Sequence, residues 1–275
     1  MKVIWFSEIK WNFLTHRHHH LIRHFPETWE ILFIESFVLG KENHFRPRRD
    51  GRVVYATVPI FKGTEYKAIN ALQNNSLFRG MVSVLLRLWI KLLLTQTGFS
   101  DSGKIILTSN IYFADIIRRL KRNLLIYDCN DYPMGFSGGL PMAETYFRKS
   151  VECADIAIAV SNRLLEDIGR YKKGNGYVIG NGVDYDLFAH AMGSPAPSDI
   201  EKIKKPIALY CGVISDWFDF ELLETAARKL PDVSFVIIGP SLSEKSEKEL
   251  KQASRCPNVF LLGLKEHSEL PRYIR

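Results

Sequence analysis

KIILT at residues 104–108, LLIY at 124–127 and IAIAV at 156–160 are three short apolar runs that indicate the fold class of this chain. Helical patterns at about 113–120 and 141–153 separate them. Short apolar strands that alternate with helices are typical of a parallel sheet covered on both faces. The segment therefore predicts an α/β protein.

The same alternation continues in both directions from this segment. Toward the N-terminus it predicts strands at 2–6, 29–34 and 52–59, and helices at 17–25 and 76–94. Toward the C-terminus it predicts strands at 177–179, 207–211, 233–238 and 259–262. The helices predicted there are at 162–168, 220–230, 243–254 and 268–274.

A break in the pattern predicts two domains. Residues 192–205 contain Gly193, Pro195 and Pro197 but no periodic apolar pattern, which is typical of a linker. We therefore expect a domain at 1–191, a linker at 192–205 and a second domain at 206–275. The second domain offers only three strands, fewer than the about 4 to 6 of a usual sheet, so we expect it to be incomplete and the chain to be truncated.

Composition narrows the class of protein. The chain has 275 residues, of which 46% are hydrophobic and 24% charged, as in soluble globular proteins. Its four cysteines show no CxxC spacing, which argues against a disulfide scaffold or a zinc ribbon and favours a reducing compartment. The N-terminal apolar run is too short for a signal peptide, and the longest apolar stretch, 81–94, is interrupted by Arg87 and Lys91. We expect no transmembrane segment and a cytoplasmic location.

The positive charge is concentrated in the first domain. Of 37 basic and 30 acidic residues, ten of each lie in 205–275, so the first 204 residues hold 27 basic and 20 acidic groups. Such an excess favours an anionic surface or substrate. In the helix predicted at 76–94 the polar residues fall four apart and form one stripe: Arg79, Ser83, Arg87 and Lys91. We favour a buried helix with this stripe as its narrow solvent edge; the alternative is a basic helix on an anionic bilayer, peripheral at the inner membrane face. No RNA motif or zinc finger appears, so nucleic acid is not an expected partner.

Glycines follow three predicted strands of the second domain. They are Gly212, Gly239 with Pro240, and Gly263 with Leu264. A glycine at the carboxyl end of a strand lets the backbone approach a phosphate or a base, although a single one more often only ends a strand. Three in consecutive strand–helix units favour a nucleotide-type ligand. Neither GxGxxG after the first strand nor GxxxxGK[ST] is present, which argues against NAD-dependent oxidation and P-loop hydrolysis.

Two further clusters could carry chemistry. Asp128 and Asp131 follow a predicted strand, where they could serve as a general base and bind sugar hydroxyls, or only form an Asx turn; both interpretations stay open. Gly138 and Gly139 predict a mobile loop after them. His16, His20 and His24 lie four apart on one helix face, but without a paired glutamate they favour a basic, solvated helix start over a metal site. We expect no metal and no cofactor.

The order of several motifs resembles a known family. Asp128, Asp131, Glu144, Ala154-Asp155, Val160-Ser161 and the run Asn181 to Asp184 before Phe188 resemble the N-terminal half of bacterial glycosyltransferases of family 4. Trp11, Arg17 and Leu21 resemble one subgroup, and the segments 207–214, 237–240 and 258–263 resemble the opening of the family's nucleotide-sugar domain.

This resemblance implies a GT-B fold: two Rossmann-like domains with parallel sheets, the first for the acceptor and the second for the donor. It places Gly212, Gly239, Pro240, Gly263 and Leu264 in the donor site and makes Asp131 the candidate catalytic residue. Arg17, Asp128 and Asn181 would lie on the acceptor side or in the cleft.

The resemblance also implies an activity. It would be the transfer, with retention, of a sugar from a UDP-, GDP- or dTDP-sugar to a cell-envelope polysaccharide or a lipid-linked acceptor. Two departures matter: residues 215–219 contain no Lys or Arg for the diphosphate, and the family's paired-glutamate segment would lie beyond residue 275. We therefore expect this polypeptide to show weak catalysis or none. The alternative is a non-catalytic binding remnant or a regulatory protein of the same fold.

Overall fold

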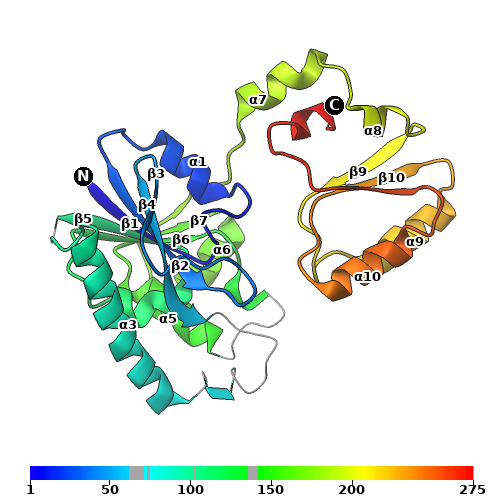
Figure 1. Ribbon diagram of the computed structural model, residues 1–275. Coiled ribbons are helices and arrows are strands. Elements are labelled where there is room, and N and C mark those ends of the chain that lie inside the picture. Colours follow the sequence, from blue (N-terminus) through cyan, green and yellow to red (C-terminus); the bar gives the residue numbers. More distant parts are fainter. Residues whose placement is uncertain (62–70, 73–74, 102, 136–141, 275) are drawn as a thin grey trace. The chain divides into compact units, whose positions relative to one another are not determined.

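The computed structural model in Figure 1 describes residues 1–61, 71–72, 75–101, 103–135 and 142–274. The chain divides into two compact units, Met1–Gly182 (unit 1) and Val183–Arg275 (unit 2). Both are built from parallel strands and helices, as the alternating pattern predicts. No helix of the described ranges combines the length and apolarity that a membrane span needs.

Unit 1 is organised around a sheet of eight strands among its described residues. Their order is β3-β4-β2-β1-β5-β6-β7-β8, and every pairing is parallel except that of β3 with β4. The strands are β1 (Lys2–Ser7), β2 (Glu30–Phe37), β3 (Arg48–Asp50), β4 (Val53–Phe61), β5 (Lys104–Thr108), β6 (Leu124–Cys129), β7 (Ile156–Ala159) and β8 (Gly176–Val178).

Side chains of the central strand β1 fill both layers of the core. Val3 and Trp5 face a cluster that includes Ile22 of helix α1, whereas Ile4 and Phe6 face the cluster under the other helices. Because successive side chains of a strand point to opposite faces, a wholly apolar strand needs this double cover. The helices are α1 (Arg17–His24), α3 (Ser76–Gln96), α4 (Ala114–Ile117), α5 (Ala143–Cys153) and α6 (Asn162–Gly169).

Unit 2 contains three parallel strands in the order β11-β10-β9, namely β9 (Ile207–Cys211), β10 (Ser234–Ile238) and β11 (Val259–Gly263). Helices α9 (Phe220–Lys229) and α10 (Glu244–Ala253) contribute Leu223 and Leu250 to the core on one face. The other face is covered by α8 (Ser198–Glu201) and the 3-10 turn η4 (Leu270–Arg272). The helix predicted at 268–274 is thus only this single turn.

The segment predicted as a linker is part of unit 2. Ile200 and Ile203 are buried in the same core cluster as Val236 of β10. Asp199 binds Lys265 at 2.7 Å and the Tyr273 hydroxyl at 3.0 Å. Proline and glycine correctly indicated turns at 192–205, but two buried isoleucines make too short a pattern to detect. The units divide after Gly182, nine residues before the predicted end of the first domain, and helix α7 (Tyr185–His190) follows in unit 2.

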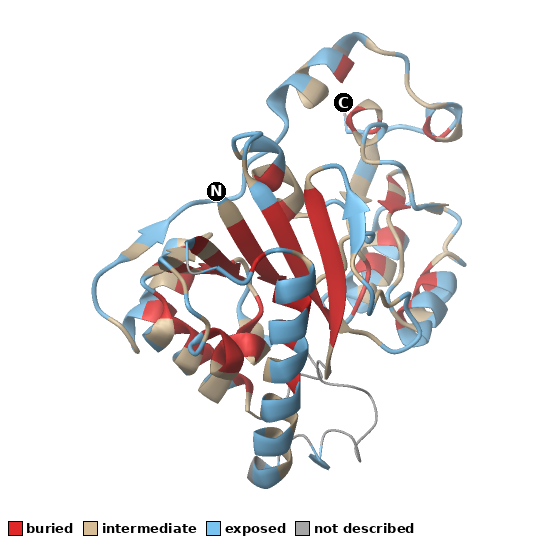
Figure 2. Ribbon diagram, turned by 60° about the vertical axis from the view of Figure 1, so that its left-hand side comes forward, coloured by how far each residue is buried: buried red, intermediate tan, exposed pale blue. Residues whose placement is uncertain are grey.

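The interpretation of α3 as a helix with a polar solvent edge is correct only for Lys91, which is exposed. Leu86 and Ile90 are buried as expected, but Arg79, Ser83 and Arg87 are only half-exposed. The most exposed face instead carries leucines, including Leu85 and Leu88. Figure 2 shows how much of this long helix is exposed. Both faces of α3 are apolar, so the sequence pattern could not show which of them packs on the sheet.

Candidate functional site

The acceptor-side residues lie at the carboxyl edge of the unit 1 sheet. Parallel strands end at one edge, and ligands of open α/β sheets bind beyond it. Strand β1 leads there to Glu8 and β6 leads to Asp131, while α1 begins nearby at Arg17. The structure therefore brings together residues from three parts of the sequence.

Arg17 joins these parts through its guanidinium group. Its Nε donates to both carboxylate oxygens of Asp128, at 3.1 and 3.3 Å. One terminal nitrogen donates to the Gly180 carbonyl at 2.9 Å and to Oδ1 of Asn181 at 3.1 Å, and the other donates to the Ile179 carbonyl at 3.1 Å. Every nitrogen of the fork thus has a partner inside unit 1.

This arrangement gives Arg17, Asp128 and Asn181 a structural function. The structure brings these three residues together, and their polar groups form hydrogen bonds with one another. Asp128 is buried, and burial raises the pKa of its carboxyl, while the charge of Arg17 acts in the opposite direction. We assign these three residues to positioning the edge of the site.

Asp131 and Glu8 are the carboxylates that remain for a ligand. The Asp131 residue is exposed, yet partial desolvation of its carboxyl, and then the charge of Glu8, raise the pKa of that carboxyl. Glu8 accepts a hydrogen bond from Nδ2 of Asn130 at 2.9 Å through Oε1, and its Oε2 is buried without a hydrogen-bond partner. The sequence analysis missed Glu8, although its place directly after the first strand was the signal that could have identified it. Gly138 and Gly139, predicted to form a mobile loop, lie outside the described residues.

The coupling between these carboxylates can be measured. We expect Glu8→Gln to lower the pKa of Asp131, because the variant removes the negative charge that disfavours ionisation. A ¹³C NMR titration of the Asp131 carboxyl would show this. Glu42→Gln is the control, since Glu42 is exposed and is not among the charges that act on Asp131. An unchanged Asp131 pKa in Glu8→Gln would show that the charge of Glu8 does not influence the ionisation of Asp131.

Two pockets lie beside the described part of this edge. One, of about 270 Å³, is lined by Tyr132, Glu144, Arg170 and Tyr171. Tyr132 directly follows Asp131 in the sequence, so this pocket lies next to that carboxylate. It presents a carboxylate, a guanidinium and phenol groups, which suit the hydroxyls of a sugar.

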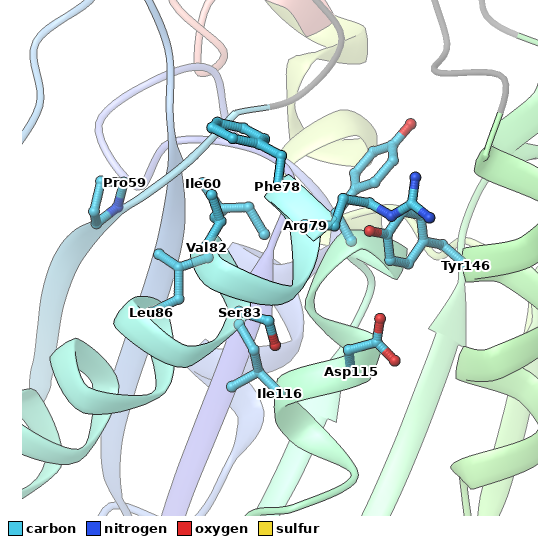
Figure 3. Close-up of a pocket in the computed structure, with 11 residues that line it drawn as sticks. Pro59, Ile60, Phe78, Arg79, Val82, Ser83, Leu86, Asp115, Ile116 and Tyr146 are labelled. Atoms are coloured by element: carbon cyan, nitrogen blue, oxygen red, sulfur yellow. The ribbon is translucent and has the colours of Figure 1, made fainter. Parts of the chain in front are cut away.

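The other pocket, of about 140 Å³, lies under the N-terminal part of α3 (Figure 3). Ile60, Val82 and Ile116 are among its apolar lining, and Arg79 lies beside the ring of Tyr146 at its polar side. Such a lining suits a ligand with an apolar part and a polar part.

In unit 2 the three predicted glycines meet at the carboxyl edge of the sheet. The Gly212 amide donates to the Ile238 carbonyl at 2.9 Å, and the Gly239 amide donates to the Gly263 carbonyl at 2.9 Å. Gly239 has φ +139°, and a Cβ there would lie 1.8 Å from the Gly212 carbonyl oxygen. Gly263 has φ +70° with no atom within 4 Å of an added Cβ. The backbones therefore pack closely at Gly239 and leave open space at Gly263.

The neighbouring residues shape the same edge. Pro240 accepts a hydrogen bond from the Ile214 amide at 3.0 Å, and Leu264 is exposed beside Gly263. Helices α9 and α10 begin after this edge, capped by Asp219 and Ser243. Helix N-termini carry partial positive charge that favours phosphate.

One histidine of α1 packs into the core. His18 is buried near Phe33 and Trp5, and burial, then its histidine neighbours, lowers its pKa to about 2, so it is neutral at pH 7. Of the three histidines predicted to lie on a solvated helix face, His24 is exposed, whereas His16 and His20 are half-buried. Among the residues that the structure describes, no three His, Cys, Asp or Glu side chains gather as metal ligands would.

Comparison with known proteins places this geometry in context. No model of a known protein family matches the chain. TuaH of Bacillus subtilis (strain 168), assigned to teichuronic acid biosynthesis as a glycosyltransferase, is 26% identical over 165 residues, which cover 54% of this chain and 41% of TuaH. The chain thus spans less than half the length of this relative.

Two solved structures share the fold. One is described as "Trehalose-6-phosphate from E. coli bound with UDP-2-fluoro glucose". It matches with a TM-score of 0.64 and 12% sequence identity, and the match covers 100% of this chain and 76% of that chain. The other is Alr3699/HepE of Anabaena in complex with UDP and glucose, with a TM-score of 0.61, 18% identity and coverage of 99% and 71%. This chain therefore has the GT-B fold of these structures, and part of its sequence is similar to the glycosyltransferase TuaH.

Proposed function

We propose that the chain binds a nucleotide-sugar at the carboxyl edge of the unit 2 sheet and serves its transfer, with retention, to a glycan or lipid-linked acceptor of the cell envelope. The observation that carries the proposal is the meeting of Gly212, Gly239 and Gly263 at one sheet edge. UDP-sugars are the first donors to test, because the two structures of the same fold hold UDP-2-fluoro glucose and UDP with glucose.

The donor side must stabilise a departing nucleoside diphosphate. The loop 215–219 contains Asp216 and Asp219 but no Lys or Arg. Charge that develops on the diphosphate would therefore be met by backbone N–H groups and by the N-termini of α9 and α10. The open space at Gly263 leaves room for the donor to approach the backbone.

The acceptor side offers a carboxylate for a hydroxyl group. Asp131 could accept the hydrogen bond of the attacking hydroxyl and orient it, with Glu8 as its neighbour. Its ionised form is the competent one, and its raised pKa means that this form is lost at higher pH than in an ordinary aspartate. The pocket at Tyr132 and Glu144 would hold the rest of an acceptor sugar.

Unit 1 would bind the cytoplasmic face of an anionic membrane. Its excess of basic residues suits an acceptor that carries phosphate and is anchored in such a membrane. The rival function, a non-catalytic binding protein of the same fold, shares the donor site but not the transfer.

Donor binding can be tested by thermal unfolding of the full chain. We expect UDP-glucose at about 100 times its Kd to stabilise the fold by about 2.7 kcal/mol, seen as a rise in Tm, with GDP- and dTDP-glucose as comparisons. Leu264→Asp should abolish this rise, because it places a negative charge beside Gly263. Leu230→Asp, at a similarly exposed leucine after the far end of α9, should preserve it.

Each outcome separates the proposals. No rise in Tm with any of the three donors would contradict the proposed donor site. A rise without release of UDP in the presence of acceptor would favour the non-catalytic binding protein. Equal loss of the effect in both leucine variants would remove the assignment to the edge at Gly263.

A further inference from the structure

The outer face of α3 carries a continuous stripe of exposed apolar side chains. It consists of Leu77, Met81, Leu85, Leu88 and Leu92, which are 82%, 64%, 62%, 61% and 57% exposed. At the α-helical rotation of about 100° per residue they fall within about 80° of the helix circumference. We call this set the apolar stripe. Large exposed apolar patches on a folded domain mark a binding surface.

The opposite face of α3 holds the helix on unit 1. Leu86, Ile90 and Leu93 are buried in the core cluster that also contains Ile4 and Phe6 of β1. The apolar stripe therefore cannot turn inward without exposing these residues. It lies along the surface of unit 1 over several turns, as Figure 2 shows for the long exposed helix.

Basic and aromatic residues border the stripe. On one side the same helix carries Arg87 and Lys91. On the other side Trp89 contacts the half-exposed Phe45 at 6.2 Å between ring centroids. Phe45 precedes three exposed arginines in the chain, and α3 itself contains no acidic residue; these arginines are Arg46, Arg48 and Arg49.

We infer that α3 is an interfacial helix that lays the apolar stripe into one leaflet of an anionic bilayer. A leucine-rich stripe with a tryptophan beside it and arginine and lysine along its borders has the chemistry of the headgroup boundary, where the apolar face enters about 5–10 Å. The positive borders select anionic lipid, and the absence of acidic residues on α3 removes the repulsion that such a surface would cause. A protein partner would need a surface that is complementary in shape to the stripe. A bilayer needs only the arrangement seen here, which is an apolar stripe with aromatic and basic residues along its borders.

The inference deepens the proposed function, because it names the surface by which the chain would reach a membrane-linked acceptor. Phe78, Arg79 and Val82 of the same helix line the pocket of Figure 3. An acceptor with an apolar chain could therefore pass from the bilayer along α3 to the carboxyl edge of the unit 1 sheet. The membrane contact itself rests on the apolar stripe and its borders alone.

Vesicle co-sedimentation of the full chain tests the inference. We expect the chain to partition onto vesicles of phosphatidylglycerol and phosphatidylcholine in equal parts, and Leu85→Glu/Leu88→Glu to weaken this partition about tenfold or more, since two charges replace two inserted leucines. The matched control is Leu222→Glu/Leu230→Glu on unit 2, at leucines that are 63% and 50% exposed. Arg46→Gln/Arg48→Gln/Arg49→Gln should remove the preference for anionic over pure phosphatidylcholine vesicles.

The outcomes are distinct. Equal partition of both leucine double variants would overturn the inference. So would a wild-type dimer that binds no vesicles and dissociates in Leu85→Glu/Leu88→Glu, which would assign the stripe to a second copy. An unchanged lipid preference in the arginine variant would overturn the choice of an anionic surface. Circular dichroism and the rise in Tm with UDP-glucose check the folding of each variant. Vesicle binding without a rise in Tm contradicts the proposed function and leaves this inference standing. A rise in Tm without vesicle binding overturns this inference and leaves the proposed donor site standing.

Discussion

Gly239→Ala is expected to unfold unit 2. A Cβ at residue 239 would lie 1.8 Å from the carbonyl oxygen and 2.7 Å from the carbonyl carbon of Gly212. Both are backbone atoms at the end of β9, so no side-chain movement relieves the overlap. The φ of +139° is also one that alanine rarely adopts. We expect the free energy of unfolding to fall by about 4 kcal/mol or more, which is comparable to the whole stability of a small unit.

Hydrogen exchange followed along the chain is the measurement for this variant. Amides of β9, β10 and β11 should lose protection while those of β1 and β5 keep it, because the two units have separate cores. The matched control is Gly263→Ala, where φ is also positive but no atom lies within 4 Å, so about 1 kcal/mol of backbone strain is expected. Equal losses in the two variants would contradict the close backbone contact at Gly212.

Arg17→Met is expected to destabilise unit 1 by about 3 to 5 kcal/mol, the effect of leaving a buried charge without its partner. Asp128 would keep its buried carboxylate, and the carbonyls of Ile179 and Gly180 would lose their donors. Denaturant unfolding monitors the loss. Arg148→Met serves as the control, because Arg148 pairs with Glu152 where both side chains are exposed, and this pair should contribute about 1 kcal/mol or less.

The effect of Arg17→Met should depend on pH in a defined direction. Burial raises the folded-state pKa of Asp128 above its ordinary 3.8, and Arg17 opposes this rise. A raised carboxyl pKa means that stability is greatest when the group is protonated and is lost as pH rises through the folded-state pKa. Without Arg17 the pKa rises further, so the gap to wild type should be widest at neutral pH and narrow on acidification.

A double variant tests whether the charge is the cause. Arg17→Met/Asp128→Asn removes the unpaired carboxylate, so it should lose less stability than Arg17→Met alone, and its gap to wild type should no longer narrow on acidification. Additive losses from the two substitutions would show that Arg17 and Asp128 act independently.

Local patterns in the sequence were enough to predict most of the architecture. The strands at 104–108, 124–127 and 156–160 follow from short apolar runs whose burial on both faces needs no long-range information. Glycines at 212, 239 and 263 could be placed at one edge because parallel strands all end on the same side. The predicted linker at 192–205 failed because Ile200 and Ile203 are buried by strands that come later in the chain.

Local sequence patterns were enough to predict the alternation of strands and helices, because an apolar run or a helical repeat can be recognised from neighbouring residues alone. Tertiary packing selects which apolar face of α3 meets the sheet, because each face is hydrophobic enough to be buried. It also decided that Arg17 binds Asp128 and the carbonyls of residues 179 and 180, partners that lie 111 to 163 positions away along the chain. A guanidinium group can meet such acceptors only where the packing of separate strands brings them within hydrogen-bond distance.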